Sequence, residues 1–206
     1  MISIGGRVLM TSVLRNSELE LAQLGCAPVR DRKSVRVLIG GLGLGYTLRA
    51  ALDVLPGHAH VVVAEINPIV VRWCRGPLAI LTDDSLADPR VTVAEQDVTK
   101  VIRRVVDRPK EPRFDAIIWD LYRGPGSTLQ HEQPLYGHAS VERVFRALSE
   151  GGVFAVWGER PDPSFRARLK KCGFAVERTQ SSGKGPKHAV YVAVKPAGAQ
   201  PATERP

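Results

Sequence analysis

The sequence lacks any apolar run close to the roughly 20 residues that a membrane-spanning helix needs, and it has no charged-then-apolar signal at its start. Cysteine is scarce: Cys26, Cys74 and Cys172 are far apart and odd in number, which fits neither a disulfide framework nor a metal cluster. We therefore expect buried free thiols, no bound metal, no membrane partner and a cytoplasmic protein.

Aromatic residues make up only 6% of the 206 residues, and the 29 Lys and Arg side chains include no long basic run. The net charge of +8 is compatible with anionic partners. Nucleic-acid binding, however, concentrates cations in patches beside aromatic side chains, so we do not expect a nucleic-acid partner. A hydrophobic content of 44% is enough for a substantial core, which indicates one large domain.

Glycine is concentrated in one place, where four glycines fall within residues 40–45. A buried-strand pattern precedes them at 35–39, and a helical pattern begins near Thr47. Strand, glycine turn and helix are typical of a nucleotide-binding βα unit. The full dinucleotide pattern is not met, because position 46 is Tyr46. A tight βα connection without a ligand is the alternative interpretation.

Strand and helix patterns then alternate along the chain. The segment 178–188 has no helical pattern, so we expect the last two strands to be antiparallel. The alternation predicts an α/β fold, a three-layer sandwich around a seven-stranded, mostly parallel sheet. The expected strands are 35–39, 59–65, 91–95, 114–120, 153–157, 174–177 and 189–194.

Three regions follow from this pattern. Residues 1–34 hold a strand, or half a hairpin, and a helix opened by a capping box at Ser17 and Glu20. Residues 35–195 form the nucleotide-binding domain. Residues 196–206, rich in Pro and Ala, are expected to be a disordered tail.

Three expected strands are followed by an acid: Glu65, Asp97 and Asp120. Parallel strands bring their carboxyl ends to one edge, where unpaired like charges repel. A ligand rich in hydroxyls and amines, with cationic character, explains their presence. Glu65 lies 20 residues beyond Gly45, the place of an acid that accepts from ribose hydroxyls. The alternatives are a solvated strand end for Glu65 and a turn or helix cap for Asp120.

Five ordered motifs resemble the spermidine synthase family, the polyamine aminopropyltransferases. They occupy residues 37–49, 64–68, 88–97, 114–120 and 148–153. The resemblance implies the Rossmann-like fold of the class I S-adenosylmethionine-dependent methyltransferases. It also implies a donor, S-adenosylmethionine or its decarboxylated form, and no metal.

The resemblance assigns roles to particular residues. Glu65 would hold the ribose, Asp97 the adenine amino group, and Asp120 would be catalytic and help remove a proton from the attacking amine. Tyr122, Arg123 and Tyr136, in the long loop expected at 121–137, would contact a small-molecule acceptor. The donor-binding residues would be Gly40, Gly41, Gly43, Glu65, Ile66, Asp97 and Val98.

Two departures from the family pattern concern the acceptor. The family has a second acid three residues after the first, where this chain has Arg123. The family's N-terminal domain, which contributes to oligomerisation, is reduced to a remnant in residues 1–34, although a homodimer is still compatible with the resemblance. Aminopropyl transfer to an amine is the first hypothesis. Methyl transfer to a small molecule and ligand binding without catalysis are the alternatives.

Overall fold

The computed structural model describes residues 2–4, 7–10, 16–121, 124–125, 133–180 and 188–199. Its strands are β1 Ile2–Ile4, β2 Arg7–Met10, β3 Arg36–Gly40, β4 His60–Ala64, β5 Val91–Ala94, β6 Phe114–Trp119, β7 Leu148–Gly158, β8 Ala175–Gln180 and β9 Ala189–Val194. Its helices are α1 Asn16–Cys26, α2 Tyr46–Val54, α3 Pro68–Cys74, α4 Val98–Asp107, α5 Gln133–Tyr136, α6 His138–Ala147 and α7 Pro163–Lys171, with short 3₁₀ turns η1 Ala27–Val29, η2 Ala79–Thr82 and η3 Ser85–Ala87.

Seven strands form one sheet in the order β5-β4-β3-β6-β7-β9-β8. The first five in this order are parallel, while β9 runs antiparallel to both β7 and β8. The predicted fold class and the antiparallel C-terminal pair are therefore confirmed. The strands β1 and β2 pair with each other in a separate antiparallel hairpin, so the N-terminal segment holds a complete hairpin and not the single strand or half hairpin that was expected.

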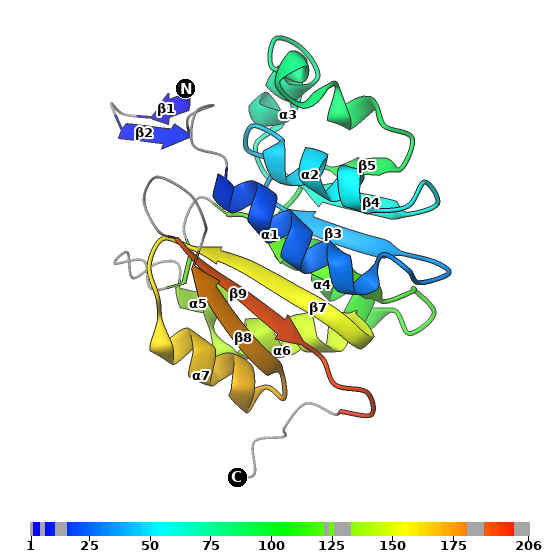
Figure 1. Cartoon of the computed structure of the whole chain (residues 1–206), viewed down its shortest axis with the longest axis vertical. Coiled ribbons are helices and arrows are strands. Elements are labelled where there is room, and N and C mark those ends of the chain that lie inside the picture. Colours follow the sequence, from blue (N-terminus) through cyan, green and yellow to red (C-terminus); the bar gives the residue numbers. More distant parts are fainter. Residues whose placement is uncertain are drawn as a thin grey trace.

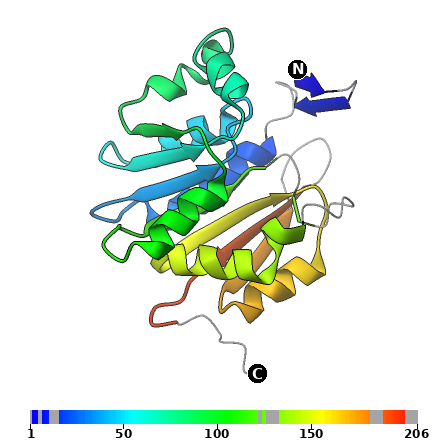
Figure 2. The same cartoon turned by 180° about the vertical axis from the view of Figure 1, so that it is seen from behind.

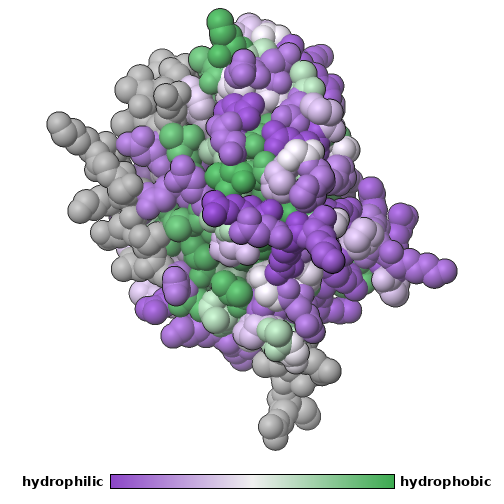
Figure 3. Space-filling model, turned by 45° about the vertical axis from the view of Figure 1, so that its right-hand side comes forward, coloured by the Kyte–Doolittle hydropathy of each residue, from purple (hydrophilic) through white to green (hydrophobic). Residues whose placement is uncertain are grey.

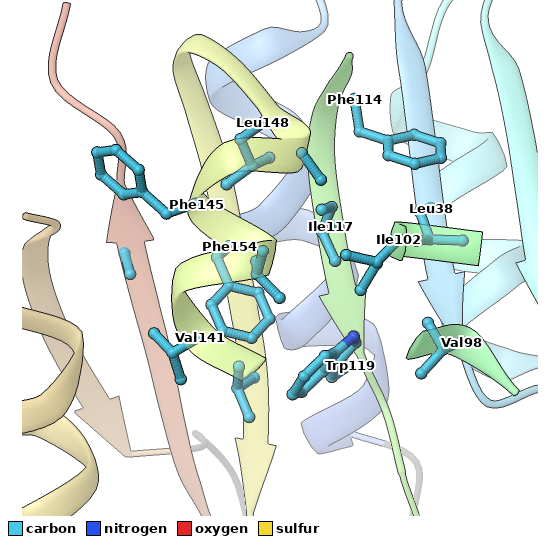
Figure 4. Packing of buried hydrophobic residues seen from close by; sticks show 14 of the residues in the cluster. Leu38, Val98, Ile102, Phe114, Ile117, Trp119, Val141, Phe145, Leu148 and Phe154 are labelled. Atoms are coloured by element: carbon cyan, nitrogen blue, oxygen red, sulfur yellow. The ribbon is translucent and has the colours of Figure 1, made fainter. Parts of the chain in front are cut away.

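Helices cover both faces of the sheet, as the sandwich requires. The helices α1, α2 and α3 lie on the face toward the viewer in Figure 1, and α4, α6 and α7 lie on the face seen in Figure 2. Each face has its own hydrophobic cluster. On the second face, α4 and α6 pack onto β3, β6 and β7 (Figure 4) through Leu38, Val98, Ile102, Phe114, Ile117, Trp119, Val141, Phe145, Leu148 and Phe154.

Two local predictions need correction. The helix α1 begins at Asn16, so Ser17 lies within its first turn, where its hydroxyl donates to Glu18 Oε2 at 2.6 Å instead of capping the helix. The strand β7 begins at Leu148 rather than at 153, because the chain enters the sheet directly after α6 and pairs with β6 from Phe114 onward.

All three cysteines are free and buried, as predicted. Burial raises the pKa of Cys26 to about 12, and that of Cys74 and Cys172 to about 11. The thiols therefore stay protonated and behave as small apolar groups. None of the helices in the described part of the chain is long and apolar enough to cross a membrane.

The described surface is mostly hydrophilic on the face shown in Figure 3, with smaller hydrophobic patches between the polar side chains. In the described part of the chain, the exposed large hydrophobic side chains belong to α3 and the segments on either side of it. They are Ile66, Ile69, Trp73 and Ile80. Ile66 follows Glu65 directly and is 70% exposed, so an apolar surface adjoins the end of β4.

The buried Asp115 carboxylate ties together the amino-terminal side of the sheet. Its Oδ1 accepts from Arg32 Nη1 at 2.5 Å and from the Ser149 hydroxyl at 2.8 Å, and its Oδ2 accepts from the Arg36 backbone N–H at 2.9 Å. Three donors from three segments would lose their acceptor together if this carboxylate were removed.

We expect Asp115→Ala to destabilise the fold by about 2–3 kcal/mol, because it leaves partly buried donors unsatisfied. The midpoint of urea unfolding measures this loss. Asp107→Asn, at an exposed position at the end of α4, is the matched control and should change the midpoint little. Equal midpoints for the Ala variant and the parent chain would show that water replaces the carboxylate without cost.

Candidate active site

The backbone register brings three strand ends to one edge of the sheet. The N–H of Gly41 donates to the Ala64 carbonyl at 2.9 Å, and the N–H of Asp120 donates to the Gly40 carbonyl at 3.0 Å. The N–H of Glu65 donates to the Ala94 carbonyl at 3.1 Å. Sheet hydrogen bonding thus continues just past β3, β4 and β6, so the glycine turn lies between the segments that carry Glu65 and Asp120.

The turn between β3 and α2 depends on glycine. Gly41, Gly43 and Gly45 have φ values of 89°, 55° and 85°, which disfavour residues with a Cβ. A Cβ on Gly41 would also collide with the Asp120 carbonyl oxygen. The end of β3 therefore approaches the end of β6 backbone to backbone.

Glu65 holds the turn in place. The side chain is buried, Oε2 accepts from the Leu42 N–H at 2.9 Å, and Oε1 accepts from the Asn67 N–H at 2.8 Å. Each carboxylate oxygen has a further lone pair. The arrangement can therefore stabilise the turn and still accept hydrogen bonds from ligand hydroxyls. The Cys74 thiol supports the same turn by donating to the Gly43 carbonyl at 3.4 Å.

Asp97 caps α4, because its Oδ1 accepts from both the N–H and the hydroxyl of Thr99 at 2.7 Å. Val98 is buried and packs against Gly40, where an added Cβ would lie 2.9 Å from a Val98 methyl group. Capping and packing account for both residues structurally, so their roles in donor binding remain predictions.

Asp120 is half-buried, and its Oδ2 accepts a short hydrogen bond from the hydroxyl of Thr47 in the first turn of α2. Burial raises the pKa of this carboxyl to about 6. The Thr47 hydrogen bond lowers the pKa, and the negative charge of Glu18 on α1 raises it. A carboxyl that titrates near pH 6 can accept a proton at neutral pH and hold it briefly.

The structure describes only one of the three residues that were predicted to contact the acceptor. Tyr122 and Arg123 lie outside the described residues. Tyr136 is buried, with its ring edge-on to Trp119 and Phe165, each at a centroid distance of 5.6 Å. The ring of Tyr136 thus packs in the aromatic part of the core, and an acceptor contact by this residue remains a prediction.

Two neighbours of Asp120 were not predicted from the sequence: Thr47 and Glu18. The hydroxyl in the first turn after the glycines was the available signal for Thr47. Nothing in the pattern of α1 distinguishes Glu18 from Glu20. Among the described residues, no group of three His, Cys, Asp or Glu side chains could hold a metal ion.

A family model described as the spermine/spermidine synthase domain matches residues 21–165. A curated relative, the polyamine aminopropyltransferase of Mycobacterium tuberculosis, is 34% identical over 131 residues, which are 63% of this chain and 23% of the relative. The chain thus spans about a quarter of that relative's length.

Solved structures show the same fold. Spermidine synthase from Thermotoga maritima superposes with a TM-score of 0.65 and 22% identity, covering 86% of this chain and 60% of that one. Human methyltransferase-like protein 13 in complex with SAH gives a TM-score of 0.63 and 18% identity, covering 90% of this chain and 82% of that one.

Proposed function

Because this chain belongs to the spermine/spermidine synthase family, we propose that it transfers an aminopropyl group from decarboxylated S-adenosylmethionine to an amine. The observation that carries the proposal is Asp120, a carboxyl whose pKa is raised to about 6 and which lies against the glycine turn. Amine alkylation needs such a group, since a protonated amine has no lone pair for attack.

The donor would lie along the edge formed by the glycine turn and the end of β4. The free lone pairs of Glu65 would accept from the ribose hydroxyls, and Asp97 would accept from the adenine amino group. Exposed Ile66 would supply apolar surface for the base. A decarboxylated tail carries an ammonium and no carboxylate, which suits an edge with three acidic residues.

The chemical step needs one proton transfer and one substitution. The acceptor ammonium gives a proton to the Asp120 carboxylate, and the freed lone pair forms a bond to the carbon beside the sulfonium sulfur. The carbon–sulfur bond breaks with its electrons going to sulfur, which leaves a neutral thioether, while the product nitrogen becomes cationic. Asp120 then releases its proton to solvent. The sulfonium is already activated, so positioning supplies much of the remaining catalysis.

The charged side chains near the proposed site indicate which amines could act as acceptors. Asp120 and Glu18 would attract an ammonium, whereas a cation at Arg123 would disfavour a long diamine. We therefore propose a primary amine of small size, with Tyr122, Arg123 and Tyr136 as further contacts. Three further predictions from the sequence are retained: a cytoplasmic location, a homodimer, and domain boundaries after residues 34 and 195.

Calorimetry with both donors, followed by mass spectrometry of products from a panel of primary amines, tests the proposal. We expect the decarboxylated donor to bind more tightly and to yield an aminopropylated amine together with the thioether. A methylated product from S-adenosylmethionine would instead establish a methyltransferase. Binding of either donor without any product would point to a binding protein.

A further inference from the structure

Thr47 is a buried hydroxyl that is directed at another element rather than at its own helix. The residue is 2% exposed and lies in the first turn of α2. A helical threonine commonly bonds the carbonyl three or four residues earlier. Here the hydroxyl donates to Asp120 Oδ2, at the end of a strand 73 residues away in sequence.

The glycine turn fixes this contact from both sides. Gly45 precedes α2 in a left-handed conformation and accepts the first helical hydrogen bond, from the Arg49 N–H at 2.9 Å. Gly41, at the other end of the turn, contacts the backbone carbonyl of Asp120. The same turn therefore fixes the helix that carries Thr47 next to the strand end that carries Asp120.

The hydrogen bond leaves the two carboxylate oxygens unequal. Among the described residues, Thr47 is the hydrogen-bond donor to Asp120, and it occupies Oδ2. Oδ1 receives no such donor from the described residues, so both of its lone pairs are available to the amine proton, whereas Oδ2 has one left. Among the described residues, the charged side chain whose electrostatic effect on Asp120 is resolved is Glu18 of α1, which raises the pKa, while the Thr47 hydrogen bond lowers it. Arg123 lies outside the described residues.

We propose that Thr47 is a positioning residue that orients Asp120 through Oδ2 and keeps it ionised, so that Oδ1 receives the proton of the amine. The inference rests on the proposed function for the identity of the proton donor. The Thr47–Asp120 link itself does not depend on that identity, so the two can be tested separately.

Carbon-13 NMR of aspartate-labelled protein measures the Asp120 titration directly, with the signal assigned by its absence in Asp120→Asn. We expect Thr47→Val, which is nearly isosteric, to raise the Asp120 pKa by about one pH unit, because a hydrogen bond to the charged form is lost. Thr47→Ser should retain the parent titration. Glu18→Gln should move it the opposite way, to lower pH.

Kinetics supply the second measurement. In Thr47→Val the acidic limb of the pH profile of kcat/KM should move to higher pH, by the same amount as the NMR titration. The kcat of this variant should fall about tenfold or more. Thr47→Ser should keep both the pH profile and the kcat of the parent. Thr92→Val, in β5 and three strands away from β6, is the matched control. An unchanged Asp120 titration in Thr47→Val would overturn the proposal. Absence of turnover in every variant, with the NMR shift present, would reject the proposed function alone.

Discussion

Asp120→Asn should lower turnover by about 10²–10⁴-fold, the usual contribution of a general base. The amide keeps the shape of the side chain and can still accept the Thr47 hydroxyl through its oxygen, but it cannot take a proton from an ammonium. Donor affinity should change much less, because Glu65 and the glycine turn are untouched. Single-turnover rates with saturating donor separate the two effects.

The same substitution should stabilise the protein at alkaline pH. Burial raises the Asp120 pKa from 3.8 to about 6, so the folded state binds the proton more tightly than the unfolded chain. The resulting stability is fully present below pH 3.8 and is lost as the pH rises through about 6. At pH 8 the ionised carboxylate costs up to about 3 kcal/mol, which asparagine removes.

The unfolding temperature at pH 4 and pH 8 tests this expectation. The unfolding temperature of the Asn variant should exceed that of the parent mainly at pH 8. For Asp107→Asn, the unfolding temperature should not differ from the parent in this way. A fall in turnover together with a gain in stability would mark Asp120 as a group kept for chemistry. Parent-like turnover with a loss of stability would make it a structural acceptor for Thr47.

The sequence predicted the sheet edge well because strand ends are local features. Aliphatic runs that stop at Glu65 and Asp120, and an earlier run that stops at the glycines of residues 40–45, specify β4, β6 and β3 without reference to the rest of the fold. Parallel pairing then places these ends together, as the hydrogen bonds of Gly41 and Asp120 show. The parallel direction of these strands was predicted from the alternation of strand and helix patterns, whereas their order in the sheet was not predicted.

What the sequence could not specify depends on contacts between distant segments. Thr47 reaches Asp120 only because β3 and β6 are neighbours in register. Tyr136 belongs to a segment, 121–137, that the sequence predicts as a loop rich in glycine and proline, although the structure has the helix α5 at Gln133–Tyr136. An aromatic side chain there is compatible with either a binding site or a core. Its packing against Trp119 and Phe165 is set by α7, which lies further along the chain.

Glu65→Ala should weaken binding of the adenosyl donor by at least tenfold. In the structure Glu65 accepts the backbone N–H groups of Leu42 and Asn67. Its remaining lone pairs are available to the ribose that we propose it binds. Each charge-assisted hydrogen bond contributes about 1.5–3 kcal/mol, so the loss of one ribose contact alone corresponds to about 10–150-fold. Glu177→Gln, exposed on the far edge strand β8, is the control.

A ribose contact and a loosened turn predict different responses to a change of ligand. Glu65→Gln keeps the side-chain length but only one acceptor oxygen, and calorimetry can compare it with the parent for the donor and for an analogue without the ribose hydroxyls. If Glu65 binds the ribose, the substitution should cost affinity for the complete donor and little for the analogue. Equal losses for both ligands would mean that Glu65 acts only through the Leu42 turn. Unchanged affinity in both Glu65→Gln and Glu65→Ala would remove Glu65 from the nucleoside site.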